Sequence, residues 1–142
     1  MSENMILTFS SDIADAEAPE PIPVGTYVGT IVSAEPAVSR STGNHYINTA
    51  FRIDPDQYPA DFNAEGWPDG VILYWRRTPY DDTTRGRFQM KKMCEAIDAP
   101  MGGTIDLSAW AGLEAKLHIG HQQNPNDGTM QAEIQKLEHV DA

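Results

Sequence analysis

Residues 70–92 read GVILYWRRTPYDDTTRGRFQMKK and join an aromatic, apolar stretch to a cluster of cations. A two-residue alternation puts Val71, Leu73 and Trp75 on one face and Ile72, Tyr74 and Arg76 on the other. This predicts a β-strand from Val71 to Arg77. Six Lys or Arg residues against two Asp give this stretch a charge of +4, in a chain whose formal net charge is −11. The stretch therefore predicts a strand that leads through a charged turn into a helix.

The helix predicted after this strand is amphipathic. Apolar residues from Met90 to Ile97 follow the i, i+3, i+4, i+7 spacing of one helix face. Thr83 or Thr84 is a suitable N-cap, because a threonine hydroxyl can accept a hydrogen bond from a free backbone N–H of the first turn. Pro100 ends the helix, since proline cannot continue it.

Strand patterns lie on both sides of this central unit. Alternating, β-branched or aromatic residues occupy 25–39 and 45–53 before it, and 113–119 and 130–137 after it. Turn-forming residues separate the two members of each pair, so each pair predicts a hairpin. The resulting order has one helix between the third and fourth of five strands. The sequence therefore predicts an all-β fold with one helix, an OB-fold, which is a five-stranded Greek-key barrel.

The domain organisation follows from length and composition. A chain of 142 residues is long enough for one domain with a core, and too short for two ordinary ones. Residues 1–23 carry five carboxylates and no cation, and end in a proline-rich run. We expect a flexible acidic arm at 1–23 and one OB-fold domain at 24–142. Phe51, Phe88 and Trp110 are predicted to lie in its core.

The expected compartment is the cytoplasm. No apolar run approaches the roughly eighteen residues that a spanning helix needs, so no membrane partner is expected. The first residues are acidic, whereas a secretory signal begins with basic ones. A single cysteine, Cys94, cannot form an internal disulfide, which agrees with a reducing compartment.

No catalytic, cofactor or metal pattern stands out. The chain has no phosphate-binding P-loop, nucleophile elbow or dinucleotide fingerprint. His118 and His121 are three residues apart on one strand, so they face opposite sides. The Asp pairs 54/56 and 81/82 fall in turns, where Asp bonds to nearby backbone. We expect a protein that is not an enzyme; a nuclease using these carboxylates with Mg²⁺ is the less favoured alternative.

Aromatic rings beside cations indicate a surface for single-stranded nucleic acid, because bases stack on rings while phosphates pair with Arg and Lys. Tyr74 and Trp75 are consecutive in a strand, so at most one of them faces the ligand and the other joins the core. The residues predicted to bind nucleic acid are Arg40, Tyr46, Arg52, Tyr74, Trp75, Arg76, Arg77, Tyr80, Arg85, Arg87, Lys91 and Lys92.

Four segments carry a family resemblance: GTYVGTIVSAE at 25–35, STGNHYI at 41–47, FQMKKMCEAI at 88–97 and IDLSAWAGLEAKL at 105–117. Together they resemble the bacteriophage single-stranded DNA-binding proteins of OB-fold type. The resemblance covers residues 22–138 and includes a D-L-x-x-x-x-G connection, which Asp106, Leu107 and Gly112 match. It implies sequence-tolerant binding of single-stranded DNA in phage replication, recombination or repair, in the cytoplasm of the host cell.

The resemblance also bears on protein partners. Many single-strand binders recruit replication proteins through a long acidic C-terminal tail, whereas this chain ends in LEHVDA and has its acidic segment at the N-terminus. Replication or recombination proteins are the protein partners that the resemblance implies, and a homo-oligomer is a further expectation. An alternative hypothesis is an acidic β-barrel interaction or structural module of a phage that binds no nucleic acid, because aromatic residues and Arg are also enriched at protein interfaces.

Overall fold

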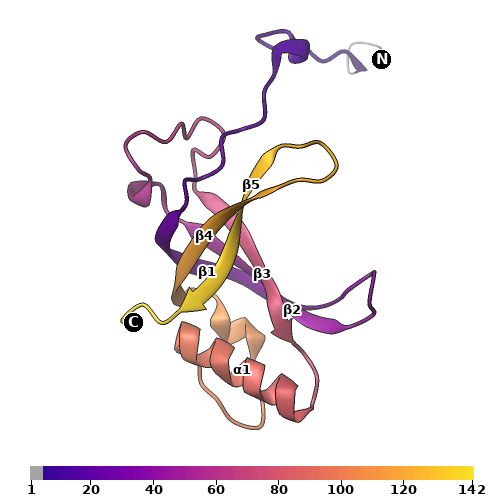
Figure 1. The fold of residues 1–142 in the computed structure, drawn as a ribbon, viewed down its shortest axis with the longest axis vertical. Helices are drawn as coiled ribbons and strands as arrows, with labels where there is room; N and C mark the ends of the chain where they lie inside the picture. Colours follow the sequence, from indigo (N-terminus) through magenta and orange to yellow (C-terminus); the bar gives the residue numbers. More distant parts are fainter. Residues whose placement is uncertain (1–4) are drawn as a thin grey trace.

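The structure, a computed structural model, describes residues 5–142 and is mostly β (Figure 1). The strands are β1 (Gly25–Val38), β2 (His45–Ile53), β3 (Val71–Pro79), β4 (Glu114–Gln123) and β5 (Met130–Glu138). Helix α1 (Thr84–Ile97) lies between β3 and β4, and the short 3-10 helices are η2 (Ile13–Asp15), η3 (Pro55–Gln57) and η4 (Leu107–Trp110). The predicted all-β fold with one helix after the third strand is confirmed.

The five strands form one antiparallel sheet in the order β3-β2-β1-β4-β5. Within the described residues no hydrogen-bonded ladder joins the edge strands β3 and β5, so the sheet is not closed. A side-chain hydrogen bond crosses between them, because Nη1 of Arg77 donates to the carbonyl oxygen of Gln135 at 3.4 Å. A groove of about 340 Å³ runs between these two edges.

Strand β1 is long because it pairs with two neighbours. Its first part pairs with β4 and its second part with β2, and Gly29 belongs to both ladders. A Cβ atom at Gly29 would lie 2.5 Å from Cδ1 of Leu117 and 3.2 Å from Cβ of Phe51. Both of these side chains are fully buried, so they have little room to move. Glycine is therefore required where the sheet bends around its core.

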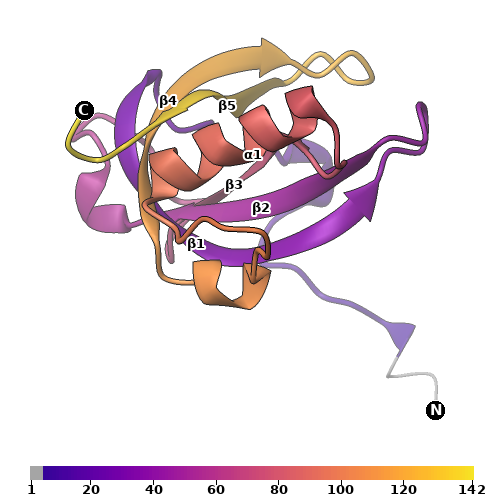
Figure 2. The ribbon, with the colours of Figure 1, turned by 90° about the horizontal axis from the view of Figure 1, so that it is seen from below.

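Helix α1 covers one end of the sheet (Figure 2). Met93, Cys94 and Ile97 are buried there, as the helical spacing predicts. Oγ1 of Thr83 accepts a hydrogen bond from the backbone N–H of Gly86 at 2.9 Å, so Thr83 is the N-cap. None of the helices between residues 5 and 142 combines the length and apolar character needed to cross a membrane.

Two of the three aromatic residues predicted for the core lie there. Phe51 is 0% exposed and Trp110 is 1% exposed. The prediction for Phe88 is wrong, because its side chain is 55% exposed. Phe88 precedes Ile97 by nine residues, which is half a turn around the helix beyond two full turns, so it lies opposite the buried face.

The N-terminal segment is anchored before β1. The predicted arm extends to residue 23, but Ile22 is only 1% exposed. Nε1 of Trp67 donates to the carbonyl oxygen of Glu20 at 2.8 Å, and Nε2 of His121 lies 2.7 Å from the carbonyl oxygen of Ile22. Residues 5–18 are exposed throughout. The packed part of the chain therefore starts near Pro19, a few residues before the predicted boundary.

Candidate nucleic-acid interface

The outer face of β3 carries the first aromatic candidate. Tyr74 is 49% exposed, whereas Trp75 is half-buried and packs against the core. Nε1 of Trp75 donates to Oγ1 of Thr78 at 3.1 Å, which holds the indole on the inner side. The structure thus agrees with the expectation that only one of these two rings faces outward. Tyr74 is the ring available for stacking on β3.

Arg76 and Arg77, the two residues after Trp75, lie at a β-bulge between β2 and β3. The register between β2 and β3 shifts between Ile47 and Thr49, so Arg76 and Arg77 together oppose the single residue Asn48. Consecutive side chains of a regular strand point to opposite faces, but a bulge re-aims one of them. Both arginine side chains are consequently exposed.

Each of these arginines stacks on an aromatic ring. The guanidinium carbon of Arg76 lies 4.8 Å from the ring centre of Tyr74, and its Nε donates to Oδ1 of Asn48 at 3.1 Å. The guanidinium carbon of Arg77 lies 5.4 Å from the ring centre of Trp75. A guanidinium has five N–H donors, so each arginine keeps donors that no residue in the described chain occupies. Bidentate pairing with a phosphate needs two such donors.

A groove of about 690 Å³, here called the β3 groove, begins beside these arginines. It lies between the β1–β2 loop, the end of β3 and the first turns of α1, and Figure 2 shows the β1–β2 hairpin extending past that end of the helix. Three arginines and one aspartate contribute its charge. The lining residues are Ser39, Thr42, Gly43, Asn44, His45, Tyr46, Arg76, Arg77, Pro79, Asp81, Arg85, Gly86 and Gln89.

Two further predicted residues lie near the β3 groove without lining it. Tyr80 is 53% exposed, and its ring meets the His45 ring edge to face with centres 6.1 Å apart. Arg40 is exposed in the β1–β2 loop. The tertiary structure therefore brings Tyr46 of β2, Arg76 and Arg77 of β3 and Arg85 of α1 to one groove.

Three predicted cations belong to other parts of the helix surface. Arg87 and Lys91 line a second groove, across α1 from the β3 groove, and Arg87 forms an ion pair with Asp82. Nζ of Lys92 lies 5.8 Å from the ring centre of Phe88. These cations follow the helix around its axis, so the structure does not bring them to the β3 groove.

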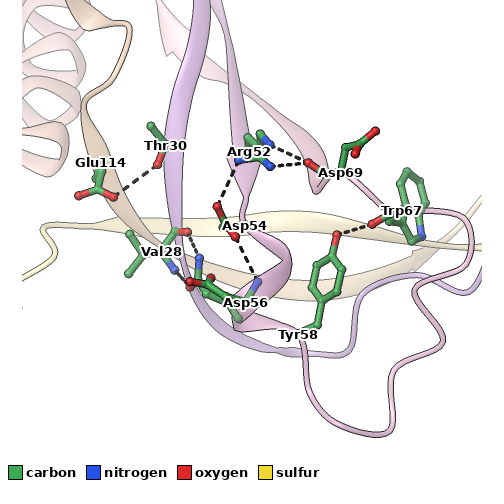
Figure 3. A network of polar contacts seen from close by, with 10 residues as sticks. Val28, Thr30, Arg52, Asp54, Asp56, Tyr58, Trp67, Asp69 and Glu114 are labelled. Carbon is green, nitrogen blue, oxygen red and sulfur yellow. Dashed lines mark hydrogen bonds and ion pairs between the residues drawn. The ribbon is translucent and has the colours of Figure 1, made fainter.

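Arg52 is held by the loop that follows β2 (Figure 3). Its Nε donates to the carbonyl oxygen of Asp69 at 2.8 Å, and its Nη1 lies 3.4 Å from Oδ2 of Asp54. In the same loop the hydroxyl of Tyr58 donates to the carbonyl oxygen of Trp67 at 2.8 Å. The guanidinium of Arg52, which the sequence predicts to bind nucleic acid, therefore ties the two ends of the 54–69 loop together.

The ionisation of Asp54, the first residue of this loop, makes the stability of the fold depend on pH. A hydrogen bond from the backbone N–H of Asp56, followed by the charge of Arg52, lowers the pKa of Asp54 below its ordinary value of 3.8. A carboxyl whose pKa is lower in the folded state stabilises the fold above its unfolded pKa, and this stabilisation is lost as pH falls through the folded pKa. We expect the free energy of unfolding to fall as pH drops below about 4, and to fall less steeply in Asp54→Asn. Urea titrations from pH 6 to pH 2.5 measure this free energy. Asp15→Asn, in the exposed N-terminal segment, is the control. Equal slopes of the free energy of unfolding against pH in Asp54→Asn and wild type would contradict the expectation.

His45 and Gln89 are among the residues lining the β3 groove that sequence reasoning missed. His45 precedes Tyr46 at the start of β2, and Gln89 follows Arg85 by four residues on α1. Residues four apart lie on the same helix face, so the spacing from Arg85 was a signal that could have found Gln89. His45 had no comparable signal, because only the fold brings the start of β2 next to the helix.

The functional interpretation rests on the geometry of the candidate site alone. No protein-family model matches this chain, and no curated protein matches it. Among residues 5–142 no three His, Cys, Asp or Glu side chains cluster in a way that could hold a metal ion.

Proposed function

We propose that this protein binds single-stranded DNA without sequence preference. The observation that carries the proposal is the β2–β3 bulge, which exposes Arg76 and Arg77 together, beside Tyr74 and at the mouth of the β3 groove. Rings stack on any base, because every base has a π-face, and guanidinium groups pair with phosphates at any sequence. The arrangement offers both kinds of contact within one strand.

The strand order supports an OB-fold. In that fold β1 is shared by two halves of a Greek-key barrel, and a helix separates the third and fourth strands, as in this sheet. OB-folds bind oligonucleotides on the face of the second and third strands, between the β1–β2 and β4–β5 loops. The bulge lies on that face and the β3 groove lies beside the β1–β2 loop. We infer a non-enzymatic role in phage replication, recombination or repair, in line with the family resemblance.

The uneven placement of charge allows DNA binding by an acidic protein. Eight of the ten Lys and Arg residues lie between Arg40 and Lys92, although the formal net charge is −11. A net negative charge repels DNA at a distance, and salt screens this repulsion beyond roughly 10 Å. Affinity then depends on short-range contacts at the bulge and in the β3 groove.

Fluorescence anisotropy of labelled oligo-dT and of the matching duplex, at low and moderate salt, tests the proposal. We expect tight binding to the single strand only, with log K falling linearly with log salt by about 0.7 for each phosphate contacted. Absence of binding even at low salt would contradict the proposal. Equal affinity for the duplex would contradict the stacking part of it, because paired bases do not offer their faces.

Replacing Tyr74 with alanine tests the stacking platform. The loss of one base–ring stack costs about 1 to 3 kcal/mol, so the Kd for oligo-dT should rise roughly 5- to 150-fold. Tyr74 is half-exposed on the outer face, so the fold should be retained. Tyr74→Phe keeps the ring and is the matched control. An unchanged Kd in Tyr74→Ala would remove this ring from the site.

A further inference from the structure

A cleft of about 200 Å³, here called the α1–β5 cleft, lies between helix α1, the end of β3 and strand β5, which runs beside the helix in Figure 2. The charged residues that line it are all cations, namely Arg77, Lys92 and Lys136. The β3 groove, by contrast, includes Asp81, and the second groove across α1 includes Asp81 and Asp82. The α1–β5 cleft is therefore positively charged, on a protein whose formal net charge is −11.

The cations of the cleft keep donors for an anion. Arg77 and Lys92 take part in none of the ion pairs of the described chain. Lys136 is 65% exposed, and its Nζ lies 3.8 Å from Oε2 of Glu138, which is a long distance for an ion pair. The other carboxylate oxygen of Glu138 contacts Nε2 of His118. A lysine has three N–H donors and an arginine has five, so each of the three cations can still pair with an anion.

The α1–β5 cleft adjoins the β3 groove. Arg77 and Gln89 line both of them. The guanidinium of Arg77 also donates to the carbonyl oxygen of Gln135, another residue of the cleft lining, at 3.4 Å. Arg77 therefore stands at the boundary between the two cavities. A DNA strand whose phosphate pairs with Arg77 has its neighbouring phosphates beside the cleft.

The size of the cleft indicates which part of a nucleotide it takes. Pockets for whole small ligands measure about 300 to 1,000 Å³, a range that includes the β3 groove at about 690 Å³. The α1–β5 cleft lies below this range at about 200 Å³, so it suits a phosphate group better than a whole nucleotide. We propose that Lys92 and Lys136 bind a backbone phosphate in this cleft, on the strand whose nucleotides occupy the β3 groove.

This inference rests on the proposed DNA binding and extends its site from the face of β2 and β3 to β5 and the middle of α1. It gives Lys136 a role, although the sequence analysis did not single this residue out. A cleft of this size admits the backbone of one strand and excludes a duplex. It therefore adds a steric reason for the expected preference for single strands.

Fluorescence anisotropy with labelled oligo-dT and the full chain tests the cleft through the double variant Lys92→Gln with Lys136→Gln. Glutamine removes the charge and keeps a long side chain, and both positions are exposed, so the fold should be retained. We expect the Kd to rise about tenfold. The log–log salt slope should become shallower by about 1.4, since each lost contact contributes about 0.7. Lys91→Gln with Lys116→Gln is the matched control, because it removes the same charge outside the cleft.

Acetylation of the wild-type protein by an N-hydroxysuccinimide ester, followed by mass spectrometry, gives a second readout. Oligo-dT should slow the acetylation of Lys92 and Lys136 and leave that of the exposed Lys91 unchanged. Equal losses of affinity in the two double variants would overturn the inference, and so would acetylation rates at Lys92 and Lys136 that oligo-dT does not alter. A wild-type protein that fails to bind oligo-dT even at low salt would instead contradict the proposed function, and this inference with it.

Discussion

Glutamate at both positions 76 and 77 is expected to remove most of the affinity for oligo-dT. Hydrogen bonds to charged groups contribute roughly 1.5 to 3 kcal/mol each, so loss of two arginine–phosphate contacts should raise the Kd by about 100-fold or more. The change from cation to anion adds repulsion to this loss. The log–log salt slope should also become shallower by roughly 1.4, since each contact with a single strand contributes about 0.7.

The matched control for this variant carries the same charge change across the helix. Arg87→Glu with Lys91→Glu alters the second groove, across α1, and leaves the β3 groove intact. Anisotropy titrations at several salt concentrations should show a much smaller loss in this control. Equal losses in the two double variants would mean that binding depends on overall charge, and the assignment to the bulge would be wrong.

Phe51→Ala is expected to produce the largest loss of stability among the substitutions considered. Phe51 is 0% exposed on β2, in the central part of the sheet. It pairs with Ile31 of β1 on one side and with Leu73 of β3 on the other. Removing a buried phenyl ring typically costs about 3 to 5 kcal/mol, because the cavity left behind closes only in part. Domains are stable by about 5 to 15 kcal/mol, so this variant should retain a small margin or unfold near room temperature.

Equilibrium urea unfolding measures this loss, and Phe88→Ala is the matched control. It removes the same side chain from an exposed position on α1, where the change should stay within about 0.5 kcal/mol. Phe51→Leu fills most of the space and should lose less than Phe51→Ala. A similar loss for Phe51→Ala and Phe88→Ala would contradict the placement of the core.

The bulge at Asn48 links the fold to the proposed function. Without it, Arg77 would point to the face opposite Arg76, toward the core, where an unpaired charge is costly. With the shift of register Arg77 is exposed, and its guanidinium lies over the Trp75 ring and donates to the carbonyl oxygen of Gln135 at the other edge of the sheet. These two arginines, which are proposed to bind phosphate, thus lie exposed at one local irregularity of the sheet.

Local patterns in the sequence were enough to predict the strands and the helix of this protein. The alternation in 45–53 predicted β2 with its observed bounds, and the helical spacing of Met93 and Ile97 predicted the buried face of α1. The alternation of Tyr74 and Trp75 also predicted that only one ring faces outward. Each of these features follows from a repeat along a single segment, and such repeats are visible without knowledge of the partners.

Contacts between side chains from distant parts of the chain became visible only in the folded protein. The tertiary structure exposed Phe88, buried Ile22, and bound the guanidinium of Arg52 to the 54–69 loop. It also placed Arg85 in the β3 groove and Arg87 in the second groove, across α1, although both residues are arginines and only Gly86 lies between them. These outcomes depend on strand register and on contacts between segments far apart in the chain, and local periodicity carries no information about either.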